Sequence, residues 1–250
     1  LQTVRIVMFL ENKYLKFDGL NLTFETLEGL IKHNGPLYNI SKLDKIVGLE
    51  NLKNKFNFFT YPSIEAQIAN RSDDIAYNNH DIQDGIKANL FSIYDLGEID
   101  FFKKIIKSHK KNINRKNKEI LIYQVIRDSI NIMVQDIINT TIKNIKLSKI
   151  KNNKDIYYLN KNLVSFSKEL KNIEEEIKNF LKTKMYNNHD VLLKNNKGKL
   201  IIKKLFQEIS RRPKKYLNIT QLNKGKYRAI ADYISGMTDR YAINLYKNIK

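Results

Sequence analysis

Three polar side chains are evenly spaced in the stretch SDDIAYNNHD, where Asp73, Tyr77 and Asp81 follow one another at intervals of four residues. In an α-helix this spacing turns successive side chains by about 40°, so all three lie on one face. The two carboxylates are then roughly 12 Å apart along the axis, which is too far for both to bind one metal ion. The spacing suits a ligand that lies along the helix, with a divalent cation at one end and a sugar hydroxyl at the other.

A second interpretation of this stripe stays open, because acidic residues at four-residue intervals are also typical of a solvated helix face. In favour of a site, carboxylate oxygens suit a divalent cation beside phosphates, and a tyrosine ring offers a flat face to a sugar or base. The spacing alone does not choose between the two.

The elements that would position these residues are helices. The 250 residues include only three prolines and nine glycines, and apolar residues recur at i, i+3, i+4 and i+7 over long stretches. Thr23 is a candidate N-cap for a helix over 22–33, and Ser63 is one for a long helix over 63–89. Further helices are predicted near 98–110, 117–146, 167–187, 197–211 and 226–248. No alternation typical of strands is present, so we predict an all-α fold.

The weakest periodicity lies in LSKIKNNKDIYYLNKN, residues 147–162, which is polar and rich in asparagine. We interpret this stretch as a connection between a helical unit over 1–146 and a second one over 163–250. A short irregular insert within a single domain is the alternative.

The composition excludes some kinds of site and favours others. The chain has no cysteine, which excludes disulfides and thiolate metal sites and predicts a reducing, cytoplasmic setting. No apolar run approaches about 18 residues, so we expect no membrane-spanning helix. The net charge of +19 favours polyanions such as nucleotides, nucleic acid or anionic lipid. A general enrichment in Lys, Asn and Ile would produce the same charge without any partner.

The segment KHNGP places Lys32 and His33 at a predicted helix end. They are interpreted either as basic residues that complement the helix dipole or as phosphate contacts. None of the four histidines has HxxxH or HExxH spacing, and no glycine-rich phosphate loop occurs.

Three segments resemble signature segments of bacterial dGTP triphosphohydrolase-like (dGTPase-like) proteins, which belong to the HD-domain phosphohydrolase superfamily. They are FDGLNLTFETLEGLIKHNGP (17–36), SIEAQIANRSDDIAYNNHDIQDGIKANLFS (63–92) and YRAIADYISGMTDRYA (227–242). Residues 163–209 also resemble the C-terminal associated region of that family. The resemblance covers nearly the whole chain, in the family's order.

This resemblance implies part of a helical HD domain, followed by a helical associated region. It implies a metal-dependent hydrolase, with Mg²⁺ or Mn²⁺, that converts a dNTP such as dGTP to deoxynucleoside and inorganic triphosphate, in a protein that forms homo-oligomers. Asp73 would be a metal ligand, and Tyr77 and Asp81 would lie against the deoxyribose near its 3′-hydroxyl. Lys32 and His33 would approach the phosphates.

The chain also departs from the family pattern, in which a His and a His-Asp doublet precede the residue that matches Asp73. Here the two His-Asp pairs, at positions 80–81 and 189–190, come later. The chain therefore resembles the C-terminal portion of such an enzyme, and Asp73 alone should hold a divalent ion poorly. Arg71 and Ser72 stand where the family has small apolar residues, so Arg71 is either a phosphate contact or an exposed side chain. A non-catalytic remnant, or a basic accessory protein that binds nucleic acid, is the alternative function.

Overall fold

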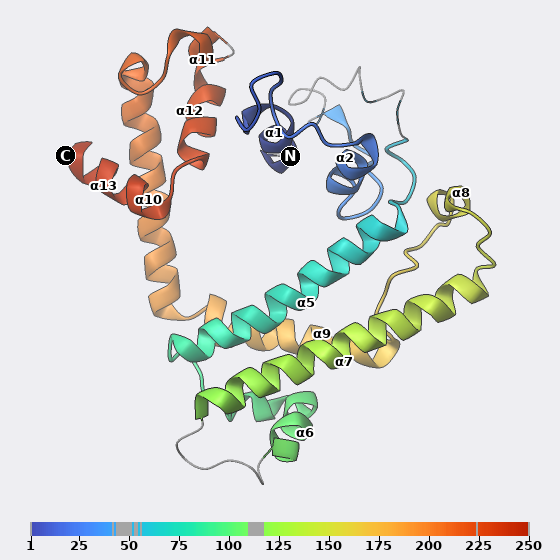
Figure 1. Ribbon diagram of the computed structural model, residues 1–250. Helices are drawn as coiled ribbons and strands as arrows, with labels where there is room; N and C mark the ends of the chain where they lie inside the picture. The colour runs from blue at the N-terminus through green and yellow to red at the C-terminus, as the bar shows by residue number, and fades with distance from the viewer. Residues whose placement is uncertain are drawn as a thin grey trace. The chain divides into compact units, whose positions relative to one another are not determined.

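The computed structural model describes residues 2–41, 43, 52, 55, 57–109, 118–223 and 225–249 (Figure 1). Their regular structure is helical, and the only pairing of the β type among them is an isolated bridge between Asn12 and Gly19. The all-α prediction is therefore confirmed. The chain forms two compact units, Leu1–Leu181 and Lys182–Lys250. The predicted domain limits, with a connection at 147–162, stay a prediction.

The N-terminal unit is built around one long helix, α5 (Ile64–Lys87), which packs against three others. Its partners are α2 (Phe24–Ile31), α7 (Lys118–Leu147) and α9 (Lys168–Leu181). Figure 1 shows α5 and α7 as the two long helices of this unit. The remaining elements among the described residues of this unit are α1 (Gln2–Arg5), a π-helix (Ile6–Leu10), a 3₁₀-helix (Asp95–Glu98), α6 (Asp100–His109) and α8 (Asn153–Tyr157).

The local signals for α2 and α5 act as the sequence predicts. The hydroxyl of Thr23 accepts a hydrogen bond from the backbone N–H of Thr26 at 3.3 Å, which caps the first turn of α2. Ser63 caps α5 in the same way, accepting from the N–H of Ala66 at 3.3 Å. After α2 the chain turns through Gly35, whose φ of 101° lies in the left-handed region that glycine tolerates.

The C-terminal unit surrounds α10 (His189–Arg211), which packs against α12 (Lys226–Ser235) and α13 (Asp239–Ile249). Its core includes Leu205, Ile209 and Ile230, each with none of its surface exposed. The smaller elements of this unit are a π-helix (Lys182–Tyr186), a 3₁₀-helix (Pro213–Lys215) and α11 (Ile219–Asn223).

For two helices of this unit, the predicted limits were wrong. Helix α10 begins at His189 rather than near 197, because the side chain of Asn188 accepts from the N–H of Asp190 and caps the helix there. The predicted helix over 226–248 is two helices, since α12 ends at Ser235 and Thr238 starts α13. The Thr238 hydroxyl accepts from the N–H of Tyr241 at 3.2 Å.

In the part of the chain that the structure describes, no helix is both long enough and apolar enough to cross a membrane.

Two tyrosine hydroxyls in the C-terminal unit predict a pH-dependent contribution to stability. Tyr233 and Tyr241 place their Oη atoms 3.2 Å apart. This hydrogen bond, followed by burial, raises the pKa of Tyr233 to about 12. The folded state therefore holds this proton more tightly than the unfolded chain. Its contribution is complete below the ordinary tyrosine pKa of about 10 and is lost as the pH rises towards 12.

We expect Tyr241→Phe to lower the pKa of Tyr233 and to reduce the free energy of unfolding by about 0.5 kcal/mol near neutral pH, a modest value because Tyr241 is half exposed. Ultraviolet titration measures the pKa, with Tyr233→Phe as the variant that identifies the signal. An unchanged titration in Tyr241→Phe would contradict the hydrogen bond.

Candidate functional site

Helix α5 carries the predicted stripe on the side opposite its packed face. Ile75 and Ile82 are buried on the packed face, whereas Asp73 and Tyr77 are exposed, with 51% and 64% of their surfaces accessible. Asp81 is half-buried. The three side chains thus share one helix face, as their spacing predicts, and the side chains of Asp73 and Tyr77 are accessible to a ligand.

His33 is the predicted residue that the fold brings to this stripe. It follows the last turn of α2, and its Nε2 lies 3.8 Å from Oδ2 of Asp73. Both side chains are partly accessible, and 41% of the His33 side chain is exposed. The imidazole, from the turn after α2, and the carboxylate, from α5, therefore form one cluster at the start of the stripe.

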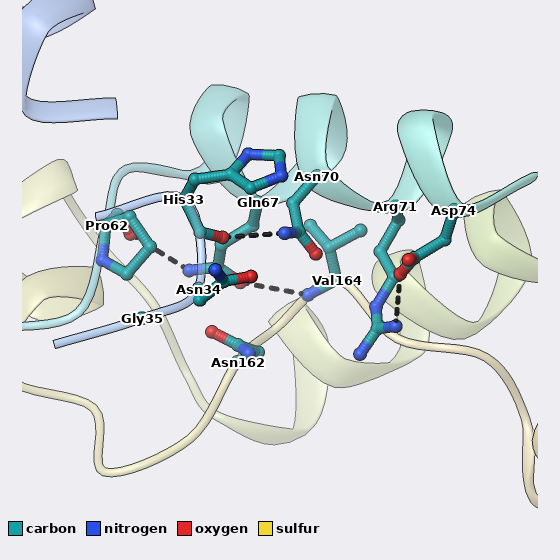
Figure 2. A pocket seen from close by; sticks show the side chains of 10 residues that line it. All are labelled: His33, Asn34, Gly35, Pro62, Gln67, Asn70, Arg71, Asp74, Asn162 and Val164. Carbon is teal, nitrogen blue, oxygen red and sulfur yellow. Dashed lines mark hydrogen bonds and ion pairs between the residues drawn. The ribbon is translucent and has the colours of Figure 1, made fainter. Parts of the chain in front are cut away.

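Two amide side chains on α5 hold this arrangement (Figure 2). Nδ2 of Asn70 donates to the backbone carbonyl of His33 at 2.6 Å, which fixes the end of α2 against α5. Gln67 is buried, and its Nε2 donates to the carbonyl of Pro62 at 3.0 Å. Its Oε1 accepts from the N–H groups of Leu163 and Val164 at 2.8 and 3.1 Å.

The sequence interpretation missed these roles. It assigned no role to Gln67 or to Asn70. The one signal available was the pair of amides three residues apart in EAQIAN, which a helix places near each other.

Two pockets meet at His33. One has a volume of about 230 Å³ and is lined by polar groups that include Asn34, Asn70 and Arg71. Figure 2 shows Arg71 paired within this pocket with Asp74, from Nη1 to Oδ2 at 2.8 Å. Arg71 is therefore an ion-paired side chain at a pocket wall.

The second pocket, of about 560 Å³, is lined by Asp73 and His33 together with apolar residues such as Leu30 and Leu37. Tyr77 and Asp81 lie further along α5 and line neither of these two pockets.

Lys32 is placed differently from its neighbour His33. Its side chain is fully buried, and its ammonium donates to Glu28 at 2.6 Å and to Thr60 at 2.8 Å. Burial lowers the pKa of Lys32, and Glu28 partly offsets this effect. Burial and then the charge of Glu28 raise the pKa of the neighbouring Tyr157. A phosphate contact by Lys32 stays a prediction, and it would require the ammonium to leave Glu28.

The described residues do not by themselves fit a divalent metal ion. Across these residues, no three His, Cys, Asp or Glu side chains are grouped so that they could hold one. Asp73 and His33 offer at most two donors, whereas Mg²⁺ requires near-octahedral coordination and is held through carboxylates, phosphates and water. Asp73 can therefore contribute one ligand to such a site but cannot complete it with the groups around it.

Comparison with known proteins identifies the family of this chain. The chain is 61% identical, over 249 residues, to a protein of Pelagibacter ubique strain HTCC1062 that is named "Deoxyguanosinetriphosphate triphosphohydrolase-like protein". The match covers 100% of this chain and 67% of that relative. The chain belongs to the deoxyguanosinetriphosphate triphosphohydrolase-like family.

Other members of this family support the assignment. Relatives with the same name from Bartonella quintana and Rickettsia conorii are 35% and 33% identical, and each match covers 99% of this chain. It covers 64% and 66% of those relatives, so the chain spans about two thirds of the length of the curated relatives it matches. A family model described as a phosphohydrolase-associated domain matches residues 164–248. The resemblance to a phosphohydrolase family is thus confirmed.

The burial of Lys32 predicts that this residue stabilises the fold. We expect Lys32→Met to reduce the free energy of unfolding by about 3 kcal/mol, because it leaves the Glu28 carboxylate buried without its cation. The double variant Glu28→Gln/Lys32→Met should recover much of this loss, since neither buried charge remains. Urea denaturation measures both changes. A Lys32→Met protein as stable as the wild type would contradict the buried ion pair.

Proposed function

We propose that this chain supplies the nucleotide-positioning part of a metal-dependent dNTP triphosphohydrolase, with dGTP as a substrate. The reaction would release deoxynucleoside and inorganic triphosphate. The observation that carries the proposal is the cluster of His33 and Asp73 at the start of the stripe on α5, where two pockets meet. Membership of the dGTPase-like family supports the substrate class.

Each residue of the cluster and the stripe has a role in this proposal. The Asp81 carboxylate would accept a hydrogen bond from the 3′-hydroxyl of the deoxyribose, and the exposed ring of Tyr77 would give the sugar a flat surface. The His33 imidazole lies where it could donate to a phosphate oxygen. Asp73 would be one ligand of Mg²⁺ or Mn²⁺, and the other ligands would come from groups outside the described residues.

The assembly and location of the protein are further parts of the proposal. A cytoplasmic setting fits a chain without cysteine. A homo-oligomer fits the exposed apolar side chains on α7, among them Ile138 and Ile142.

The competing proposal is that the chain does not catalyse the reaction and acts as an accessory protein that binds nucleic acid. The net charge of +19 favours it. Such a protein would bind a polyanion with a steep salt dependence and without any requirement for metal, whereas the hydrolase would need a metal and a nucleotide.

The proposed role of Asp81 predicts selectivity for the 3′-hydroxyl. We expect the chain to bind dGTP about 10-fold more tightly than 2′,3′-dideoxy-GTP, because a hydrogen bond to a charged acceptor is worth about 1.5 kcal/mol or more. Asp81→Asn should reduce this preference, and Asp100→Ala, which removes an exposed carboxylate on α6, should leave it unchanged. Calorimetric titration gives the six affinities, those of the three proteins for each of the two nucleotides. Equal affinities for both nucleotides in the wild type would contradict the role of Asp81.

The proposed role of Asp73 predicts metal-dependent release of triphosphate. If the chain releases triphosphate from dGTP with Mg²⁺ or Mn²⁺, the release should fall by at least about 100-fold in Asp73→Ala and be kept in Asp100→Ala. Ion chromatography separates triphosphate from monophosphate and pyrophosphate. If no triphosphate forms under any of these conditions while nucleotide binding persists, the chain by itself is not the hydrolase, and the accessory role is favoured.

A further inference from the structure

The turn that carries His33 follows α2 and is tied to α5 by a hydrogen bond from a side chain. Nδ2 of Asn70 donates to the backbone carbonyl of His33 at 2.6 Å, across 37 residues of sequence. Within the turn, the N–H of Gly35 donates to the carbonyl of Lys32 at 2.8 Å. This second bond closes the turn, whereas the bond from Asn70 fixes the turn against α5.

Helix α2 is anchored to the interior separately, before the turn begins. Gly29 packs closely on Ala66 near the start of α5, because a Cβ atom at position 29 would lie only 3.1 Å from the Cβ atom of Ala66. The ammonium of Lys32 is buried with its own hydrogen-bond partners. We therefore expect α2 to keep its place when the bond from Asn70 is removed, and only the turn after it to be released.

The direction of this turn sets the geometry of the cluster of His33 and Asp73. Asn70 and Asp73 are three residues apart on α5, so they are neighbours on the helix surface. Nε2 of His33 lies 3.8 Å from Oδ2 of Asp73, which is longer than a hydrogen bond of about 2.7–3.2 Å. The imidazole thus faces the carboxylate without a direct hydrogen bond, and Nε2 stays available to a ligand oxygen.

We propose that Asn70 is a positioning residue for this cluster. By holding the carbonyl of His33, it keeps the imidazole at a distance from Asp73 at which a phosphate oxygen can accept from His33 while Asp73 binds the metal. This role rests on the proposed function, in which Asn70 itself touches neither the nucleotide nor the metal. Without the bond, the nucleotide would have to order the turn as it binds, and its affinity would fall.

The first test is the NMR signal of the His33 ring in the full chain, which needs neither metal nor nucleotide. The chain has four histidines, and His33→Gln identifies the signal of its ε1 proton. Asp73→Asn should shift this signal in the wild-type background, because it removes the charge that faces the imidazole. In the Asn70→Ala background the same substitution should shift it by less than about half as much, since the two groups are no longer held together.

The second test is the affinity for dGTP in the presence of Mg²⁺, measured by calorimetric titration. Asn70→Ala and Asn70→Leu, which keeps the size of the side chain but not its donor, should each weaken the binding of dGTP about 5-fold. Deoxyguanosine has no phosphate to meet His33, so both variants should bind it as the wild type does.

A matched control separates positioning from a general loss of stability. Nδ2 of Asn144 on α7 donates to the carbonyl of Leu163 at 2.8 Å, which is the same kind of bond between two segments of the N-terminal unit. Asn144 lines neither of the two pockets that meet at His33. Asn144→Ala should lower the midpoint of urea denaturation as Asn70→Ala does, and it should leave the His33 signal and the affinity for dGTP unchanged. Equal effects of both variants on these two readouts would overturn the positioning role.

The two tests also distinguish this role from the proposed function. If the wild type binds no dGTP, the proposed function is contradicted, and the His33 signal still decides whether Asn70 positions the imidazole. If dGTP binds and prefers its 3′-hydroxyl form, but the His33 signal responds to Asp73→Asn equally with and without Asn70, the positioning role is overturned and the proposed function stands. An affinity for dGTP that is unchanged in both Asn70 variants would overturn it as well.

Discussion

The buried amide of Gln67 joins the start of α5 to the segment that precedes α9. It donates to the carbonyl of Pro62 before α5 and accepts from the N–H groups of Leu163 and Val164 before α9. Burying two backbone donors without an acceptor would cost about 1–3 kcal/mol for each. The position of α5, and with it the direction of the acidic stripe, therefore depends on one side chain that touches no proposed ligand. Asn70 adds the end of α2 to this arrangement through the carbonyl of His33.

Burial assigns different roles to neighbouring basic residues. Lys32 points into the interior, where Glu28 and Thr60 satisfy its ammonium, and there it can stabilise the fold. His33, one residue later, lies at the surface beside Asp73. The two residues are adjacent in the chain but lie in regions of very different polarity. A buried ammonium has to keep its partners, whereas an exposed imidazole can exchange water for a ligand at little cost.

The two units also differ in their charge. The N-terminal unit keeps an acidic stripe within a nearly balanced sequence, and the C-terminal unit holds most of the positive charge together with stacked aromatic side chains. The carboxylates of the first would suit a divalent cation and sugar hydroxyls, and the positive charge of the second would suit anionic ligands.

The sequence by itself determined the helical class, the caps Thr23 and Ser63, and the common face of Asp73, Tyr77 and Asp81. These features depend on hydrogen bonds and side-chain spacing within a few residues, and they require no knowledge of distant contacts. Only the tertiary structure decided that His33 meets Asp73, that Lys32 is buried, and that Gln67 joins the start of α5 to the segment before α9. Each of these depends on how helices from separate parts of the chain pack, and packing is set by the summed burial of many apolar side chains. Patterns within a few residues do not determine this packing. The acidic stripe on α5 was therefore predictable from the sequence, whereas the residues that pack around it were not.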